Sequence, residues 1–270
     1  MMLSSLGKIA VIGASGWMGQ SMWLPVLEKG LVDPESLILV NASGDFSAYQ
    51  AWRHIQKTTD MDQALAKSQS VFLSIKPASL LDLSCRLDNH LLISIMAGTS
   101  CEVLSAHFNA KRIVRAMPNT AAEQAMSFTP FYATAEVSDE QCQAVDALFK
   151  LWGRSVHVQQ EIDINRLTAL TGSGHGWMAY MASSLVRAGM HIGLDEALSR
   201  QAVDQLLLGM GAHVAQDDTP PEQVVQQLID YAGTTAAGLR QMQSKSLDQV
   251  IIAAIESSFE CARSNMSGQD

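Results

Sequence analysis

The sequence has little of what a nucleic-acid partner or a lipid bilayer would require. Only 17% of its 270 residues are charged, and the formal net charge is −9 at pH 7. Its Lys and Arg residues form no stripe that could follow a phosphate backbone. Charged residues or glycines interrupt the apolar runs before they reach the length of a membrane-spanning helix. We therefore expect neither a nucleic-acid partner nor a membrane partner.

Cysteine is also scarce. The four cysteines lie far apart, with no Cys-x-x-Cys pair, and the histidines stand alone without partners at metal-ligand spacing. Scattered cysteines of this kind are typical of reduced thiols in a cytoplasmic enzyme. The stretch from Met1 to Leu6 is too short for the apolar core of a signal peptide. We expect a cytoplasmic protein without a metal site.

The nearest approach to a basic cluster is Lys111 and Arg112 with Arg115. Two interpretations are open. The three side chains could bind the phosphate of a cofactor, or they could be solvated surface residues.

Apolar residues make up 47% of the chain, enough for a sizeable core. In residues 1–160, short apolar runs alternate with helical patterns. The runs are four to six residues long and continuous rather than alternating, as in strands of a parallel sheet that is covered on both faces. This order predicts a doubly wound α/β domain of the Rossmann type. The expected strands are 8–12, 37–40, 70–75, 91–96 and 112–116, and the expected helices include 18–29 and 62–68.

Residues 161–270 have a different character. They are rich in Ala, Leu, Met and Gln, and they show no further strand pattern. We expect an all-helical domain that contributes to substrate binding and forms at least a homodimer. The expected helices are 166–188, 195–216, 221–228 and 246–263.

A glycine-rich turn follows the first expected strand directly. Gly13, Gly16 and Gly19 lie between that strand and the next expected helix. A dinucleotide site needs a tight turn there, a close approach of the backbone to the pyrophosphate, and a helix N-terminus that points its N–H groups at the phosphates. Ser15 could add a hydroxyl donor. The alternative is a glycine-rich β–α turn that binds no ligand, and the Gly-x-x-Gly-x-x-Gly spacing differs from the commoner Gly-x-Gly-x-x-Gly.

The end of the second expected strand bears on the choice between NADPH and NADH. An NAD site usually places an acidic residue there to bind the ribose hydroxyls. This chain has Asn41 and Ser43 instead, with no acidic residue before Asp45. Neutral side chains could bind a 2′-phosphate without repelling it, so NADPH is favoured and NADH is the alternative.

Six short motifs, in this order and spacing, resemble the Δ1-pyrroline-5-carboxylate reductases of proline biosynthesis over nearly the whole chain. They lie at residues 13–19, 75–77 (Ile-Lys-Pro), 94–98 (Ser-Ile-Met-Ala-Gly), 115–120 (Arg-Ala-Met-Pro-Asn-Thr), 170–174 (Leu-Thr-Gly-Ser-Gly) and 232–239 (Ala-Gly-Thr-Thr-Ala-Ala-Gly-Leu).

The resemblance implies a role for each motif. Those in the first half would bind the cofactor, through Gly13, Ser15, Gly16, Trp17, Met18, Asn41, Ser43, Lys76, Pro77, Ala97, Gly98, Met117 and Pro118. Substrate binding would fall to Asn119, Ser173, Gly174, Gly233 and Thr234, with His175 and Thr235 as catalytic residues that orient or shield the substrate. The segment at Gly233 is expected to begin a helix, whose N-terminus would bind the substrate carboxylate. Taken singly, residues 117–118 could be only a strand-end turn and residues 172–174 only a hinge.

The departures from the family pattern lie in the expected substrate pocket. His175 replaces a proline and adds an imidazole, which could protonate an imine nitrogen. Asp230 replaces a neutral hydroxyl and could repel a substrate carboxylate. Each residue also has an interpretation without a role in the pocket. His175 could be an imidazole that faces solvent, and Asp230 could be a surface carboxylate that caps the next turn. Ala121 replaces the proline that usually follows Met-Pro-Asn-Thr.

The sequence therefore predicts hydride transfer from NADPH to a cyclic imine, with Δ1-pyrroline-5-carboxylate as the expected substrate. One alternative is a divergent imine reductase that acts on a different cyclic imine. Another is a relative that retains the fold for binding or regulation without catalysis.

Overall fold

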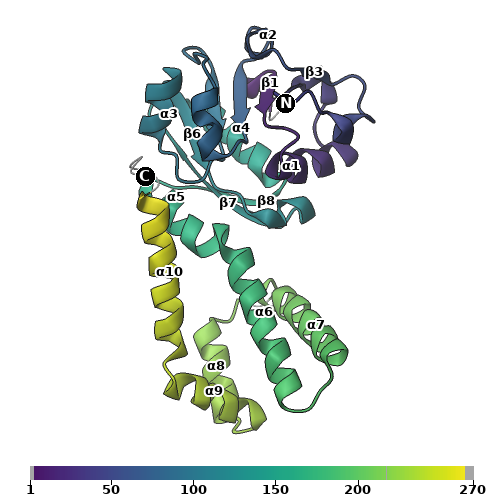
Figure 1. Ribbon diagram of the computed structural model, residues 1–270. Coiled ribbons are helices and arrows are strands. Elements are labelled where there is room, and N and C mark those ends of the chain that lie inside the picture. Colours follow the sequence, from purple (N-terminus) through teal and green to yellow (C-terminus); the bar gives the residue numbers. More distant parts are fainter. Residues whose placement is uncertain (1–2, 217, 265–270) are drawn as a thin grey trace. The chain divides into compact units, whose positions relative to one another are not determined.

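The computed structural model describes residues 3–216 and 218–264 (Figure 1). Residues 1–2, 217 and 265–270, which include the outer ends of both expected domains, lie outside the described part. The chain forms two compact units, one of Met1–Ser173 with Ser258–Asp270 and one of Gly174–Ser257. The domain boundary expected between residues 160 and 161 stays a prediction.

The first unit is built on a single sheet with the strand order β3-β2-β1-β4-β5-β6-β7-β8. Neighbouring strands are parallel except for β6 and β7, which are antiparallel. The chain order reverses between β1 and β4, which gives the sheet the switch point of a doubly wound fold. This confirms the expected fold class. The strands are β1 (Ile9–Ile12), β2 (Leu37–Val40), β3 (Gln56–Thr58), β4 (Ser70–Leu73), β5 (Leu91–Ser94), β6 (Arg112–Ala116), β7 (Ser127–Ala133) and β8 (Gly153–His157).

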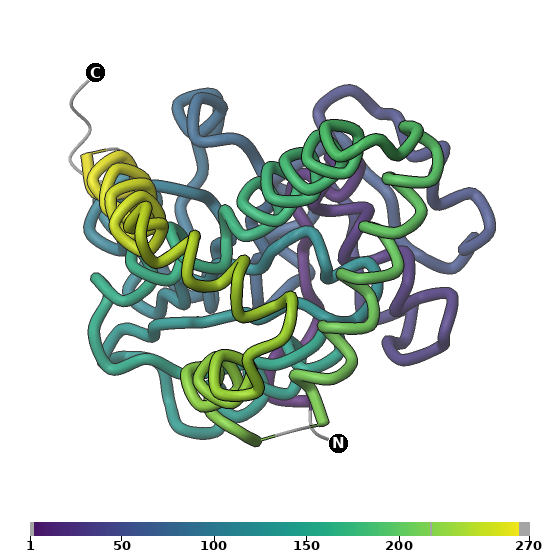
Figure 2. Tube along the Cα trace, turned by 90° about the horizontal axis from the view of Figure 1, so that it is seen from below, coloured from purple at the N-terminus to yellow at the C-terminus, as the bar shows by residue number. Residues whose placement is uncertain are grey.

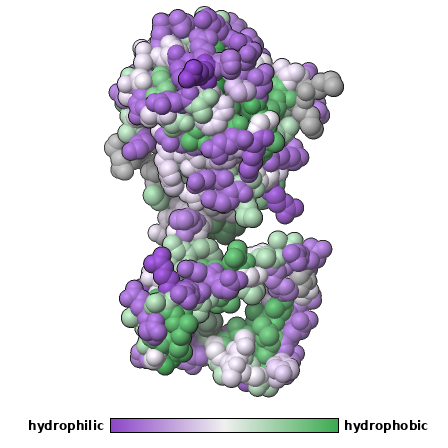
Figure 3. Space-filling view, turned by 90° about the vertical axis from the view of Figure 1, so that its right-hand side faces the viewer, coloured by the Kyte–Doolittle hydropathy of each residue, from purple (hydrophilic) through white to green (hydrophobic). Residues whose placement is uncertain are grey.

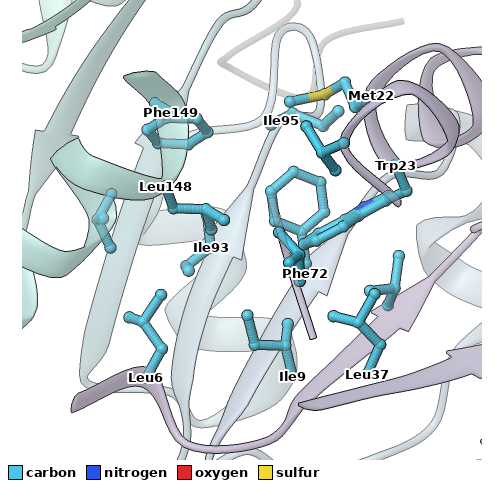
Figure 4. Close-up of a cluster of buried hydrophobic side chains, with 14 of the residues drawn as sticks. Leu6, Ile9, Met22, Trp23, Leu37, Phe72, Ile93, Ile95, Leu148 and Phe149 are labelled. Carbon is cyan, nitrogen blue, oxygen red and sulfur yellow. The ribbon is translucent and has the colours of Figure 1, made fainter. Parts of the chain in front are cut away.

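The expected apolar runs form the central strands because both of their faces are buried. Every residue of β1, β2, β4 and β5 is buried. In β1, Ile9 and Val11 point into one core while Ala10 and Ile12 point into the other. Figure 4 shows the first core, where Trp23 meets Phe72 edge-on at 5.2 Å between ring centroids.

Three strands were not predicted, because each carries a weaker signal. β3 and β8 are the two edges of the sheet, and they consist mostly of polar residues that are not fully buried. β7 contains Pro130, which weakens a strand pattern because proline cannot donate to the ladder.

The helices of the first unit pack on both faces of this sheet (Figure 1). α1 and α2 match expected helices, whereas α3 and α4 were not predicted. Each of the two missed helices begins at a capping serine, Ser100 for α3 and Ser138 for α4. The bounds are α1 (Trp17–Glu28), α2 (Met61–Leu65), α3 (Cys101–Phe108), α4 (Asp139–Lys150) and α5 (Ile162–Leu167).

The expected helix at 166–188 is interrupted. A π-helical turn, Thr168–Gly172, separates α5 from α6 (Gly174–His191). The hydroxyls of Thr168 and Thr171 donate to carbonyl oxygens four residues earlier, at 2.6 and 2.9 Å. Such bonds compete with the helical ladder and bend helices, which accounts for the break.

The second unit contains helices and, in its described residues, no strand. Its helices match the expected ones, including α9, which begins at the helix start expected at Gly233, and the trace from α6 to α10 runs from green to yellow in Figure 2. α10 leaves this unit at Ser257 and ends in the first unit. The bounds are α7 (Glu196–Val214), α8 (Pro221–Asp230), α9 (Thr234–Ser244) and α10 (Leu247–Ser264).

The second unit buries little of its own apolar surface. Among its described residues, only Ser199, Val203 and Ala236 are buried. Large apolar side chains are exposed along its helices, and Figure 3 shows the hydrophobic colour gathered there. Exposed apolar patches of this kind mark sites of association. The exposed residues include Met178, Tyr180, Met190, Ile192, Leu194, Leu206, Leu208, Met210, Val250 and Ile251.

Across the described stretches, none of the helices combines the length and the apolar character needed to cross a membrane.

Candidate functional site

The first-unit candidates gather along the carboxyl ends of the strands, the edge of the sheet that runs across the strands and not the edge strands β3 and β8. Each follows the carboxyl end of one of five adjacent parallel strands, which is where open α/β sheets bind ligands. Asn41 follows β2, Gly13 follows β1, Lys76 and Pro77 follow β4, Ala97 and Gly98 follow β5, and Met117 and Pro118 follow β6.

The glycine turn lies at the centre of this edge, between β1 and α1. Gly13 has φ +83°, and its N–H donates to the carbonyl oxygen of Val40 at 3.1 Å. A Cβ on Gly13 would lie 2.4 Å from the carbonyl oxygen of Ser74, at the end of β4. Neither the backbone angle nor this contact allows another residue at position 13.

The other two glycines let the helix start close to the turn. A Cβ on Gly19 would lie 2.5 Å from the carbonyl oxygen of Gly13 and 2.7 Å from that of Ala14. Gly16 is the N-cap residue of α1 and has no side chain to bond the first N–H groups. The start of α1 is therefore open to an anion, as the pyrophosphate of a dinucleotide requires.

The segment after β2 is tied to this turn by hydrogen bonds. Ser15 Oγ donates to the carbonyl oxygen of Asp45 at 2.6 Å. Asn41 Nδ2 donates to Ser43 Oγ at 3.0 Å and to the same Asp45 carbonyl at 2.8 Å. The backbone N–H of Ser47 donates to the Asp45 carboxylate and holds the pKa of that group below its usual value. The phosphate-binding roles predicted for Ser15, Asn41 and Ser43 stay predictions.

Tyr49 supports the glycine turn from within the core, although no sequence motif points to it. Its ring is fully buried, and its hydroxyl donates to the carbonyl oxygen of Ala14 at 2.8 Å. Burial raises the pKa of this phenol, so Tyr49 keeps its proton and remains a donor.

At the other side of the edge, the residues after β6 meet the π-helical turn. Asn119 Nδ2 donates to the carbonyl oxygen of Thr171 at 3.3 Å, and its Oδ1 accepts the N–H of Ala121 at 3.1 Å. A Cβ on Gly172 would lie 3.3 Å from Met117 Cγ. The structure thus brings together two motifs that are more than 50 residues apart. The substrate-binding role of Asn119 stays a prediction, and its amide already bonds both segments.

Both interpretations of Arg115 in the basic cluster are wrong. Its side chain is 1% exposed, so it is neither solvated nor open to a phosphate. Arg115 Nη1 lies 3.0 Å from Oε1 of the half-buried Glu161 in an ion pair.

Several candidates expose their side chains at the same edge. Trp17, the first residue of α1, is 70% exposed, and Lys76 and Pro77 are exposed at the start of a short 3-10 helix. Gly98 has φ +65° in the turn before α3, where a side chain would be strained.

The remaining candidates belong to the second unit, apart from Ser173 at the end of the first. Gly233 is the N-cap residue of α9, with Thr234 and Thr235 in the first turn, which confirms the helix expected there. His175, near the start of α6, is exposed. Asp230 is exposed and accepts the side-chain N–H of Gln226 at 2.7 Å.

Comparison with family models gives two matches. Residues 161–265 match the model described as pyrroline-5-carboxylate reductase dimerisation. Residues 8–98 match the model described as NADP oxidoreductase, coenzyme F420-dependent.

Two similar proteins are named as pyrroline-5-carboxylate reductases. Pyrroline-5-carboxylate reductase 2 of Bacillus subtilis is 27% identical, over 92% of this chain and 91% of the relative. The pyrroline-5-carboxylate reductase of Haemophilus influenzae is 28% identical, over 92% and 93%.

Solved structures agree on the fold. A pyrroline-5-carboxylate reductase from Coxiella burnetii superposes with a TM-score of 0.85 at 23% identity, covering 97% of this chain and 99% of the other. A Plasmodium falciparum pyrroline carboxylate reductase with NADP bound superposes with a TM-score of 0.81 at 22% identity, covering 96% and 97%.

The close packing of α1 against the turn predicts a graded response to added methyl groups. Gly19→Ala should lower the free energy of unfolding by roughly 1–3 kcal/mol, because two carbonyl oxygens must move. Gly16→Ala is the matched control, since its Cβ would lie 3.2 Å from the nearest carbonyl oxygen and should cost less. Urea denaturation followed by tryptophan fluorescence measures both. Equal losses in the two variants would contradict the packing described here.

Proposed function

The chain belongs to the pyrroline-5-carboxylate reductase family, and from that premise we propose that it reduces a cyclic imine to a ring amine with NADPH or NADH. Δ1-pyrroline-5-carboxylate, giving L-proline, is the substrate best supported by the relatives. The observation that carries the proposal is that one chain joins an open dinucleotide turn at the switch point to a helical half of the family's dimerisation type.

The residues at the sheet edge fit a nicotinamide dinucleotide. A Cβ on Gly13 would collide with the carbonyl oxygen of Ser74 and one on Gly19 with those of Gly13 and Ala14, so the tight turn requires glycine there, and the start of α1 carries no capping side chain. Gly13, Ser15, Gly16, Trp17 and Met18 would hold the pyrophosphate. The remaining contacts would come from Asn41, Ser43, Lys76 and Pro77. Ala97 and Gly98 would line the nicotinamide, and residues 117–120, with Met117 and Pro118, would lie between the nicotinamide and the substrate. When bound, the reduced nicotinamide supplies the hydride.

The protein itself would orient the imine against the nicotinamide, shield it from water and keep a proton on the imine nitrogen. The imine carbon gains a hydride and the nitrogen gains a proton, so an iminium that arrives protonated needs no obligatory acid. Gly233, Thr234 and Thr235 would bind the substrate carboxylate at the start of α9. Asn119, Ser173 and Gly174 would line the substrate side. His175 and Thr235 would orient the substrate, with His175 as a proton donor in the alternative account.

A panel of cyclic imines tests the reaction and its substrate. We expect NADPH-dependent reduction of Δ1-pyrroline-5-carboxylate, and lower kcat/KM for rings of other sizes or without a carboxylate. A divergent imine reductase would instead prefer a ring without a carboxylate, as the charge of Asp230 would favour. In the same assay His175→Ala should reduce kcat without abolishing it. Absence of turnover on every imine, together with no binding of NADPH, would contradict both enzyme proposals.

The neutral end of β2 supports a preference for NADPH. Asn41→Asp would place a carboxylate where Asn41 now donates to Ser43 and Asp45. It should lower the ratio of kcat/KM for NADPH to that for NADH by at least about tenfold, through repulsion of the 2′-phosphate. Asn89→Asp is the control, because it adds the same charge just before the amino end of β5. An unchanged ratio in Asn41→Asp would show that the preference is set elsewhere.

The match to the dimerisation model supports a homo-oligomer. We propose at least a homodimer through the helices of the second unit, whose exposed apolar side chains a single copy leaves uncovered. The four free cysteines support a cytoplasmic location.

Light scattering after size-exclusion chromatography measures the oligomer directly. The mass should be at least twice the 29.2 kDa of one chain. Leu208→Glu should lower that mass by placing a charge on the exposed face of α7, whereas Leu81→Glu, on an exposed leucine of the first unit, should not. A wild-type mass of one chain at micromolar concentration would refute the proposal.

A further inference from the structure

We propose that the ion pair of the buried Arg115 and the half-buried Glu161 is a positioning device for hydride transfer. It ties together the three segments assigned to the nicotinamide and the imine, namely residues 97–98, 117–119 and 171–173. It should therefore control turnover more than cofactor affinity. The inference rests on the proposed function, which assigns those segments to the reacting half of the site.

The ion pair lies largely out of contact with water, where leaving either charge without its partner would destabilise the fold. The Arg115 side chain, on β6, is 1% exposed, and that of Glu161, just before α5, is 23% exposed. The distance from Arg115 Nη1 to Glu161 Oε1 is 3.0 Å. A guanidinium held out of water is stabilised by the groups that accept its hydrogen bonds, so those groups and Arg115 constrain one another's positions.

The first tie runs to the segment before α3. Glu161 Oε1 also accepts the backbone N–H of Cys101 at 2.8 Å, across 60 positions in the sequence. Cys101 is the first residue of α3 and follows the turn of Ala97 and Gly98 closely. One carboxylate oxygen therefore holds both the guanidinium and the start of the helix that ends this turn.

The second tie runs to the π-helical turn. Arg115 Nη2 donates to Asn165 Oδ1 at 2.8 Å, and Asn165 is fully buried within α5. Asn165 Nδ2 in turn donates to the carbonyl oxygen of Ala262 in α10, at 2.9 Å. Since α5 continues directly into Thr168–Gly172, its position fixes the turn that leads to Ser173.

The third tie is along the chain. Arg115 lies near the end of β6, two residues before Met117. The residue of the ion pair and the segment proposed to lie between nicotinamide and substrate are therefore joined directly along the chain. Asn119 then returns a hydrogen bond to Thr171, which closes the loop between the second and third segments. Every contact in this network lies within the first compact unit.

Glu161→Gln is the sharpest test, because it keeps the shape and one acceptor oxygen while removing the charge. Misplacing reacting groups by about 1 Å can cost about 100-fold in rate, so we expect kcat for imine reduction to fall at least about tenfold. The dissociation constant of NADPH, measured by fluorescence, should change less than about twofold, since the bonds described above run from this pair to Cys101 and Asn165 and not to the glycine turn. Asp163→Asn is the matched control: it neutralises an exposed ion pair with Arg166 at the start of the same helix and should leave kcat unchanged.

A second readout does not depend on activity. Hydrogen exchange of the backbone amides should accelerate together in residues 97–101, 117–119 and 168–173 of Glu161→Gln, and in none of these in Asp163→Asn. Arg115→Lys keeps the charge without the forked geometry and should show the same pattern more weakly.

Two results would overturn the inference. One is a Glu161→Gln variant whose kcat and exchange equal those of Asp163→Asn. The other is a variant that loses NADPH affinity as strongly as kcat, which would show general destabilisation. If the proposed function itself is wrong, the wild-type protein will reduce no imine. The comparison of hydrogen exchange between Glu161→Gln and Asp163→Asn can still be made in that case, so the two failures are distinguishable.

Discussion

The close approach of α1 to the end of β1 is the constraint on which the candidate site depends. Gly13 passes beside the end of β4, and Gly19 lets the helix rest on the carbonyl oxygens of the turn. The unusual spacing of the three glycines satisfies both contacts. Tyr49 then bonds the Ala14 carbonyl from the core, and Ser15 bonds the segment after β2, so the turn is held from both sides.

The two compact units differ in what they can do alone. The first has two apolar cores, one on each face of a sheet, and presents five strand ends at one edge. The second has almost no buried apolar side chains among its described residues, although its helices are rich in them. The residues proposed to bind the substrate, such as Gly233 and Thr234, lie in this unit, whose exposed apolar faces a partner copy would cover, so the proposed activity and the proposed association are linked.

The sequence predicted the parts of the fold that carry strong periodic signals. Continuous apolar runs located the central strands, because both faces of those strands are buried. The edge strands β3 and β8 were missed because exposure removes the apolar signal. The glycine turn was predictable because steric demands act on single residues. Tyr49, Arg115 and Glu161 were not, because their importance comes from partners 35 to 60 residues away that no local pattern reveals.

The transfer of a labelled hydride tests the central claim most directly. NADPH carrying deuterium at the transferred position of the nicotinamide would be incubated with Δ1-pyrroline-5-carboxylate and the wild-type protein, and the product examined by mass spectrometry and NMR. The account predicts proline with one deuterium on the ring carbon that was double-bonded to nitrogen. Unlabelled proline, or no proline while NADPH still binds, would contradict direct hydride transfer to the imine.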